Sequence, residues 1–276
     1  MRTLWMSLVI VSLATLSVPG CVHTRAPVLA AAEVPGVDRV VFAADGAGNF
    51  QMSSMMLRSV AEADGLPIDI ITYEWSHGNY RIVSDQICYR YARAQGEKLA
   101  AEMIAFHQQH PCVKIYLWGH SAGAAVVLAA LEASPPCLVE GMVLLAPSVS
   151  AFYDLRPALC RVACHLDVFH SSHDCWYLGL GTRILGTSDK THRVAAGRFG
   201  FRAYIESPED ECLYSKLRQH PWHREDKELG HNGNHYGGYQ PDYLRAYIMP
   251  LFFNQRCCPP EEMQAGPSPP LRDGED

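Results

Sequence analysis

The chain has 276 residues, of which 48% are hydrophobic and 19% charged, and its formal net charge is -6. This balance is ordinary for a globular protein and offers no basic surface for nucleic acid. Without a short N-terminal leader, the length fits one α/β domain with a single substantial core.

The first twenty residues have the pattern of an export signal. A lone Arg2 precedes a long apolar run, and small residues follow it. The ending Val18-Pro19-Gly20-Cys21 resembles a bacterial lipobox, although its proline departs from the usual pattern. We predict a signal peptide at 1–20, a tether at 21–36, and a place in the cell envelope, with the membrane as a partner through a lipid on Cys21. A conventional signal, with Cys21 incidental, is the alternative.

Apolar runs of strand length alternate with segments of helical spacing through residues 37–256, which we take as the folded domain. The expected strands are residues 38–44, 68–73, 115–118, 138–146, 165–171 and a short one at 212–217. The expected helices are residues 49–63, 84–110, 154–163, 241–253 and one that follows residue 122. Such alternation predicts a mainly parallel sheet covered on both faces. The Pro-rich, charged tail at 257–276 is predicted to be disordered.

A Gly-rich loop, Asp45-Gly46-Ala47-Gly48-Asn49, follows the first expected strand. Such a loop can bring backbone N–H groups close to a substrate oxygen. The amide of Ala47, or of Gly46 beside it, is therefore a candidate oxyanion donor, and an ordinary turn between strand and helix is the alternative. Aromatic residues on other loops are expected to line the substrate pocket: Trp75, His77, Tyr80, Trp176, Tyr177 and Phe199.

The segment Gly119-His120-Ser121-Ala122-Gly123 joins an apolar strand to an Ala-rich helix. A sharp turn here lifts the side chain of Ser121 clear of the sheet, at the cost of unfavourable serine dihedrals. Glycines at Gly119 and Gly123 let the strand and the helix approach closely. The N–H of Ala122 opens the helix and would face a developing oxyanion. Ser121 is thus the candidate nucleophile, and a turn with an incidental serine is the alternative.

Nine of the ten cysteines follow Cys21, and cysteine-rich exported proteins favour disulfides. Cys112 and Cys137 precede two expected strands, so both should lie at the end of the sheet opposite Ser121. We predict a stabilising role there, for which a Cys112–Cys137 bridge is one form.

A serine nucleophile needs a base to remove its proton and an acid to orient that base. Asp174 lies a few residues beyond the strand at 165–171, on the edge where Ser121 is expected, and is the candidate acid. Asp154 is the better substitute, because Asp167 lies inside the strand.

Two histidines, His231 and His235, compete for the role of the base on a Gly-rich loop near the C-terminus. His235 is favoured because it lies closer to the expected start of the last helix at Pro241. The other histidine would then pack in the loop or bind substrate.

The order Ser121, Asp174, His235, with GHSAG as the nucleophile elbow, resembles the α/β-hydrolase superfamily over residues 38–253. The resemblance implies an α/β-hydrolase fold, and the short chain before residue 38 implies that its leading antiparallel strands are missing. Residues 176–211 replace a usual short connection and are expected to form a cap or flap. Residues 153–200 also look like poorly characterised bacterial exported proteins of this superfamily.

These features predict an exported serine hydrolase, similar to carboxylesterases and lipases, that cleaves an ester or related acyl bond of a small molecule without a cofactor. A non-catalytic cell-envelope binding or scaffold protein that retains the fold is the alternative. A metal site is disfavoured, because alternate residues of a strand point to opposite faces. Its ligands would be His165, His170, His173, Asp174 and Cys175.

Overall fold

The computed structural model describes residues 36–181, 186–191 and 193–253. The expected leader, nearly all of the tether, Cys21 and the tail at 257–276 lie outside the described residues. In the described part, no helix combines the length and the apolar character needed to cross a bilayer.

One sheet of six strands, in the order β2-β1-β3-β4-β5-β6, forms the centre of the fold, and every neighbouring pair is parallel. The strands are β1 (Arg39–Ala44), β2 (Ile68–Thr72), β3 (Lys114–His120), β4 (Val139–Leu145), β5 (His165–His170) and β6 (Leu217–Pro221). The inner strands β1, β3, β4 and β5 are almost wholly buried, as their continuous apolar runs require in a sheet covered on both faces.

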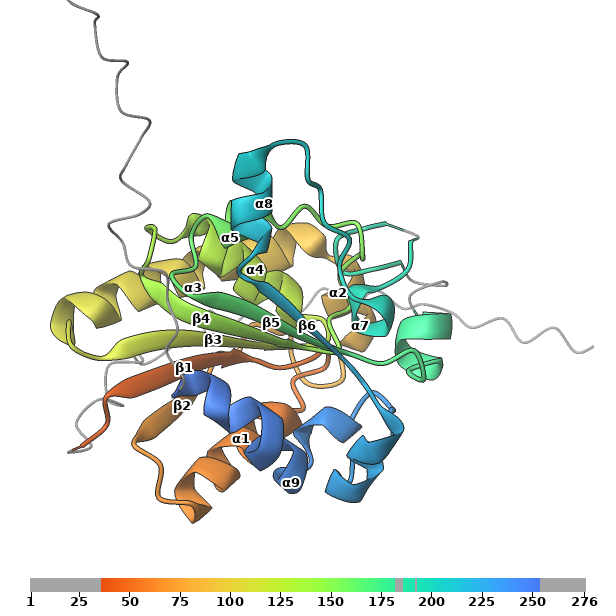
Figure 1. Cartoon of the computed structure of the whole chain (residues 1–276), viewed down its shortest axis with the longest axis horizontal. Helices are drawn as coiled ribbons and strands as arrows, with labels where there is room; N and C mark the ends of the chain where they lie inside the picture. The colour runs from red at the N-terminus through yellow and green to blue at the C-terminus, as the bar shows by residue number, and fades with distance from the viewer. Residues whose placement is uncertain (1–35, 182–185, 192, 254–276) are drawn as a thin grey trace, which may run out of the picture.

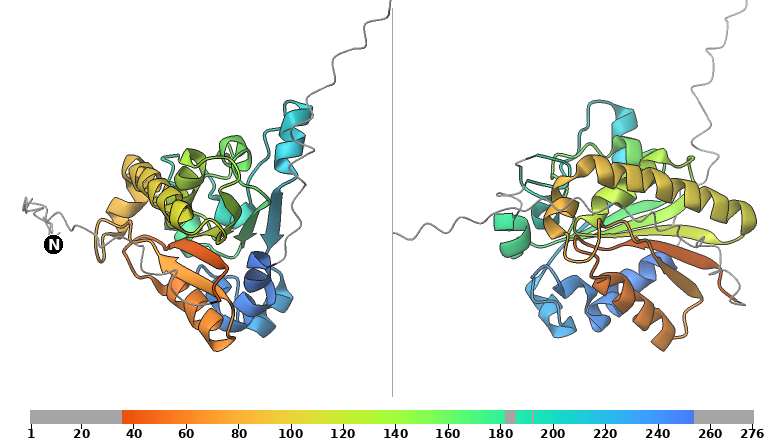
Figure 2. Two further views of the ribbon diagram at one scale, coloured as in Figure 1. Left: turned by 90° about the vertical axis from the view of Figure 1, so that its left-hand side faces the viewer. Right: turned by 180° about the vertical axis from the view of Figure 1, so that it is seen from behind.

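Helices cover both faces of this sheet (Figure 1). The two further views in Figure 2 show the sheet between the two helical layers. One layer holds α3 (Tyr89–Gln109), α4 (Gly123–Ala133), α5 (Arg156–Leu159) and α8 (Pro208–Tyr214). The other holds α1 (Met52–Ala63) and α9 (Pro241–Tyr243). The short helices α2 (Ile82–Ile87) and α7 (Ala196–Phe199) lie near the carboxyl edge of the strands. The mainly parallel α/β architecture is thereby confirmed.

Successive residues of β3 supply the two apolar cores on opposite faces of the sheet. Leu117 packs in the core beneath α3 and α4, whereas Tyr116 and Trp118 pack in the core beneath α1. This follows from the period of two along a strand. Gly96 of α3 lets α4 approach, because a Cβ there would lie 2.5 Å from the Cβ of Ala129.

The expected short strand at 212–217 is wrong, because residues 208–214 form α8 and β6 begins only at Leu217. Ser207 caps the helix by accepting the N–H of Asp210 at 3.2 Å, and Pro208 occupies the first turn. Serine before proline and acidic residues is a helix-start signal that outweighs the apolar residues further on.

Three expected helices are shorter or more divided than their periodicity indicates. The segment at 84–110 is split into α2 and α3 at Cys88, and the helix at 154–163 is reduced to α5. The last helix becomes α9, a π-helical turn at Leu244–Ile248 and a 3₁₀ turn at Met249–Phe252. Pro250 contributes to this break, because proline has no N–H to continue the helix.

The predicted bridge between Cys112 and Cys137 is wrong, since both cysteines are free and exposed. Cys137 lies in a left-handed turn with φ 62°, and its N–H donates to the carbonyl of Arg161 at 2.8 Å. This hydrogen bond ties the backbone of Cys137 to the connection that precedes β5.

Candidate active site

Ser121 lies on a sharp turn between β3 and α4 and adopts a left-handed φ of 53°. The glycines that flank it are required by close packing. A Cβ on Gly123 would lie 2.1 Å from the carbonyl oxygen of Ala44, and one on Gly119 would lie 2.5 Å from Val127 Cγ2. The predicted strained serine between two close-packed glycines is therefore present.

Replacing Gly123 with alanine is expected to lower the free energy of unfolding by about 3 kcal/mol or more, because backbone atoms must move to admit the methyl group. Urea denaturation measures the change. Gly179→Ala is the matched control, because a Cβ there meets its nearest neighbour at an ordinary 3.5 Å. Equal stability losses in the two variants would contradict the packing argument.

The structure brings Ser121, His235 and Asp174 together at the carboxyl edge of the sheet. His235 Nε2 lies 2.9 Å from Ser121 Oγ, and His235 Nδ1 lies 2.5 Å from Asp174 Oδ2. The three residues follow β3, β6 and β5 respectively, so parallel topology gathers them at one edge. His235 and Asp174 are buried, and the carboxylate fixes the tautomer in which Nδ1 donates and Nε2 accepts the serine proton.

His231, the competing histidine, does not contact Ser121 and is held within its own loop. Its Nδ1 accepts the N–H of Gly233 at 3.1 Å, and its ring packs edge to face on Tyr243. Burial lowers the pKa of His231 to about 4, although the carboxylates of Asp226 and Asp174 oppose the shift. It is therefore a neutral packing histidine.

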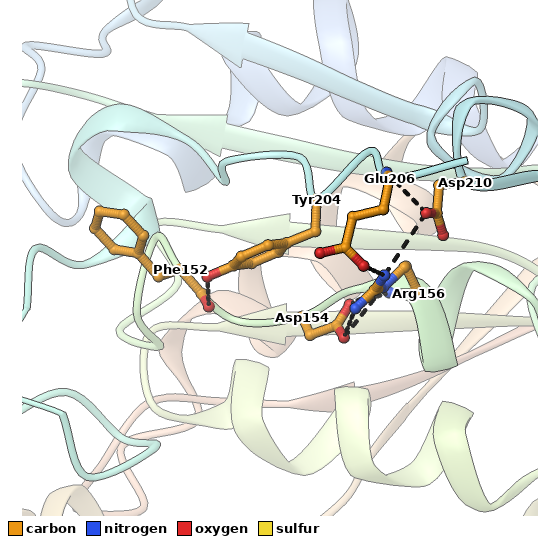
Figure 3. A network of polar contacts seen from close by, with 6 residues as sticks. All are labelled: Phe152, Asp154, Arg156, Tyr204, Glu206 and Asp210. Carbon is orange, nitrogen blue, oxygen red and sulfur yellow. Dashed lines mark hydrogen bonds and ion pairs between the residues drawn. The ribbon is translucent and has the colours of Figure 1, made fainter. Parts of the chain in front are cut away.

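The substitute acid Asp154 lies in a separate polar network (Figure 3). Its carboxylate pairs with the guanidinium of Arg156 at 2.8 Å, and the same guanidinium reaches Glu206 at 3.3 Å and Asp210 at 3.6 Å. Hydrogen bonds from Arg156 lower the pKa of the Asp154 carboxyl. This network joins α5 to α8 and to Glu206 just before it, and it makes no contact with His235.

Asp167, the other alternative acid, is wholly buried within β5 and pairs with Arg218 at 2.5 Å, His165 at 2.6 Å and His220 at 2.7 Å. Burial raises the pKa of Asp167, but the contacts with His165, His220 and Arg218 outweigh it and hold the pKa well below its usual range. Asp174 faces His235 instead. Over the described ranges, no three His, Cys, Asp or Glu side chains converge in a group able to hold a metal ion.

The loop after β1 passes directly over the elbow. A Cβ on Gly46 would lie 3.3 Å from both Ser121 Cβ and His120 Nδ1. The N–H groups of Ala47 and Ala122, the predicted oxyanion donors, have no acceptor among the described residues. Both amides are thus available to a substrate oxygen beside Ser121.

Two buried carboxylates hold this loop in place, and sequence reasoning did not assign them. Asp45 accepts N–H bonds from Ser53 at 2.9 Å and Ser54 at 3.2 Å, so it ties the loop to the start of α1. Asp85 of α2 accepts the N–H of Gly48 at 2.8 Å. The position of Asp45 at a strand end before a helix was a readable signal, whereas nothing local marks Asp85.

His120 is the buried neighbour of the elbow serine. Its Nε2 lies 3.4 Å from the carbonyl oxygen of His235, and its ring lies edge to face against Tyr239. Burial, together with the electrostatic effect of the neighbouring His235, lowers the pKa of His120 to about 3. His120 is therefore a neutral side chain that lines the cavity.

A cavity of about 440 Å³ lies above Ser121. Besides Ser121, His235, His120 and the loop at 45–47, its lining comprises Phe50, Gln51, Met52, Ile82, Gln86, Ser148, Tyr177, Leu178, Tyr236 and Tyr239. Its size suits a small-molecule substrate. Tyr177 stacks on the imidazole of His235, with ring centroids 4.9 Å apart and planes at 19°.

Among the aromatic residues expected to line the pocket, Tyr177 does so and four others do not. Trp75 is buried and donates to the carbonyl of Asp45, and His77 contacts Asp85. Tyr80 and Phe199 are exposed outside the cavity. The side chain of Trp176 lies outside the described residues. Within the expected cap at 176–211, the described residues that reach the cavity are 177 and 178.

Comparison with known proteins agrees with this architecture. Residues 98–190 match the family model described as serine aminopeptidase, S33. No curated protein matches the sequence. This match, the parallel sheet and the elbow at Ser121 support the resemblance to the α/β-hydrolase superfamily that the sequence motifs indicated.

Several solved structures resemble the chain at low identity. A poly(3-hydroxybutyrate) depolymerase from Bordetella parapertussis is 15% identical, with 83% of this chain and 84% of that chain covered and a TM-score of 0.46. The catalytic core of acetyl xylan esterase from Trichoderma reesei is 14% identical, with 67% and 82% covered and a TM-score of 0.40. A Thermogutta terrifontis esterase is 15% identical, with 70% and 74% covered and a TM-score of 0.32.

Proposed function

We propose that this protein is a serine hydrolase that cleaves an ester or a related acyl bond of a small molecule. The observation that carries the proposal is the pair of contacts that joins Ser121 Oγ to His235 and His235 to Asp174 beneath an open cavity. A nucleophile, a base and an orienting acid are the parts that acyl transfer requires.

In the first half of the proposed reaction, Ser121 Oγ attacks the acyl carbon while its proton passes to His235 Nε2. The carbonyl oxygen becomes an oxyanion, which the N–H groups of Ala47 and Ala122 stabilise. Asp174 stabilises the imidazolium. The bond to the leaving oxygen then breaks, and the leaving group takes the proton from His235, so that an acyl-enzyme remains.

In the second half, His235 removes a proton from water, whose oxygen attacks the acyl carbon of the acyl-enzyme. The same two amides hold the second oxyanion. Collapse breaks the bond to Ser121 Oγ, which recovers its proton from His235. The products are a carboxylic acid and the leaving group, and the enzyme returns to its starting state.

The cavity favours an ester over the N-terminal peptide bond that the name of the family model suggests. An aminopeptidase needs a carboxylate to pair with the ammonium group of its substrate. Asp45 is the one acidic side chain in the described lining, and its carboxylate binds the amides of Ser53 and Ser54. It therefore caps α1 and is not free to hold an ammonium group.

Labelling with a fluorophosphonate probe tests the proposal. Folded wild-type protein is expected to react stoichiometrically, and Ser121→Ala to lose all labelling. Ser215→Ala, at an exposed serine after α8, is the matched control and should label like the wild type. A folded protein that takes no label would contradict the hydrolase proposal and support the non-catalytic scaffold.

We also propose export to the cell envelope and a lipid on Cys21, on the strength of the N-terminal sequence alone. Fractionation of the producing cell is the test. The full chain should be found with membranes, and Cys21→Ala should release it. An unchanged distribution would contradict the lipid anchor.

A further inference from the structure

An arc of apolar side chains borders the cavity on the side of the loop after β1. Phe50, Met52 and Ile82 all line the cavity, although each remains 46–51% exposed. A group of half-exposed apolar side chains at the mouth of a cavity indicates a binding surface, whereas single apolar side chains scattered on a surface do not. They form what we call the apolar arc.

The backbone around Phe50 is held in an uncommon conformation. Gly48, Asn49 and Gln51 have φ values of 93°, 60° and 52°, which non-glycine residues rarely adopt. Asn49 and Gln51 each store strain of about 1 kcal/mol or more. The surroundings must therefore favour a conformation that presents Phe50 at the mouth of the cavity.

Hydrogen bonds from two other segments lock this loop. Asp85 accepts the N–H of Gly48 at 2.8 Å, and the carbonyl of Gly48 accepts the N–H of Tyr80 at 3.1 Å. Asp85 is buried and also accepts the hydroxyl of Ser76 at 2.6 Å and the N–H of His77 at 2.9 Å. The apolar arc is thus built on a fixed support.

Phe50 and Ile82 both approach the position that a side chain on Gly48 would occupy. A Cβ on Gly48 would lie 2.6 Å from Phe50 Cε2 and 2.8 Å from Ile82 Cγ1. These residues are 32 positions apart in sequence and come from the loop before α1 and from α2. The ring of Phe50 also packs edge to face against that of Tyr80, which supports it from outside the cavity.

Proton transfer decides which part of an ester would lie along the arc. The leaving oxygen must take a proton from His235, so the leaving group lies on the side of His235, against Tyr177 and Tyr236. The carbonyl oxygen lies at the amide of Ala47. The remaining direction for the acyl chain points away from His235, along the loop that carries Phe50.

The charge of the lining restricts the chemistry of that chain. The described cavity lining contains no lysine or arginine, and its one acidic residue, Asp45, is bound to the first turn of α1. A charged acyl group would lose its hydration with no partner to replace it. Resting on the proposed function, we propose that the substrates are esters of uncharged, apolar acyl chains longer than acetyl, held by Phe50, Met52 and Ile82.

A series of p-nitrophenyl esters from acetate to hexanoate, kept below their aggregation limits, tests this inference. Each methylene that the enzyme buries fully should raise kcat/KM roughly fourfold, and each methylene that it buries by half should raise kcat/KM roughly twofold. We expect kcat/KM to rise roughly ten- to twentyfold from acetate to hexanoate. Phe50→Ala and Ile82→Ala should each reduce the hexanoate-to-acetate ratio by about threefold or more. This ratio is insensitive to the fraction of folded enzyme.

Matched controls come from the exposed surface outside the cavity. Phe199 is 57% exposed and Ile205 is 55% exposed. Phe199→Ala and Ile205→Ala should keep the wild-type ratio. A ratio near one in labelled wild-type enzyme would overturn the acyl-chain inference and leave the hydrolase proposal standing. A high hexanoate-to-acetate ratio that is unchanged in both Phe50→Ala and Ile82→Ala would overturn the role of the apolar arc. Folded wild-type enzyme that does not react with the fluorophosphonate probe would overturn the proposed function itself.

Discussion

Ser121→Ala and His235→Ala are each expected to lower kcat/KM for a p-nitrophenyl ester by about 10⁴- to 10⁶-fold. The Ser121 hydroxyl is the group that forms the acyl-enzyme, and without His235 it keeps its proton. Because the two act as a unit, the double variant should be little worse than either single variant. Initial-rate kinetics with active-site titration measure these losses.

Variants of exposed residues of the same types control for general damage. His107→Ala, on the exposed face of α3, and Ser215→Ala should keep wild-type rates. His231→Gln separates the two loop histidines, because His231 packs in the loop without touching Ser121. A loss for His231→Gln as large as that for His235→Ala would contradict the assignment of the base.

The contacts of Ser121 were predictable because each depends on a signal that is local or topological. The strand, glycine turn and helix around Ser121 are consecutive in sequence. Asp174 and His235 are far apart, yet parallel strands bring their carboxyl ends to one edge, so residues just beyond those ends meet. Asp154 does not serve as the acid that orients His235, because its carboxylate forms an ion pair with Arg156, two residues away.

The cavity lining was not predictable in the same way, because it depends on side-chain packing between distant segments. Phe50 and Ile82 both lie close to Gly48, whose N–H is held by Asp85, and these contacts leave no periodic trace in the sequence. Trp75 and His77 were expected in the pocket, but buried partners satisfy their polar atoms first: Trp75 donates to the carbonyl of Asp45, and His77 contacts Asp85. Aromatic character alone does not show which way a loop side chain turns.

The protein is expected to lose about 5 kcal/mol of unfolding free energy between pH 7 and pH 4.5, because two buried histidines stay neutral in the fold. Burial lowers the pKa of His120 to about 3 and that of His231 to about 4. In the unfolded chain both titrate near 6.5. Below that pH the unfolded state binds more protons than the folded state, so stability is full above about pH 6.5 and falls as the pH drops toward 4.

His231→Gln isolates half of this effect. A glutamine oxygen can still accept the N–H of Gly233 but takes up no proton, so the slope of unfolding free energy against pH should fall by about 1 kcal/mol per pH unit between pH 6 and 4.5. Urea titrations at several pH values measure this slope, and His107→Gln, exposed on α3, should leave it unchanged. The slope is compared within one variant, so a uniform loss of stability does not affect it. An unaltered slope in His231→Gln would mean that His231 is protonated in the folded state, which its burial opposes.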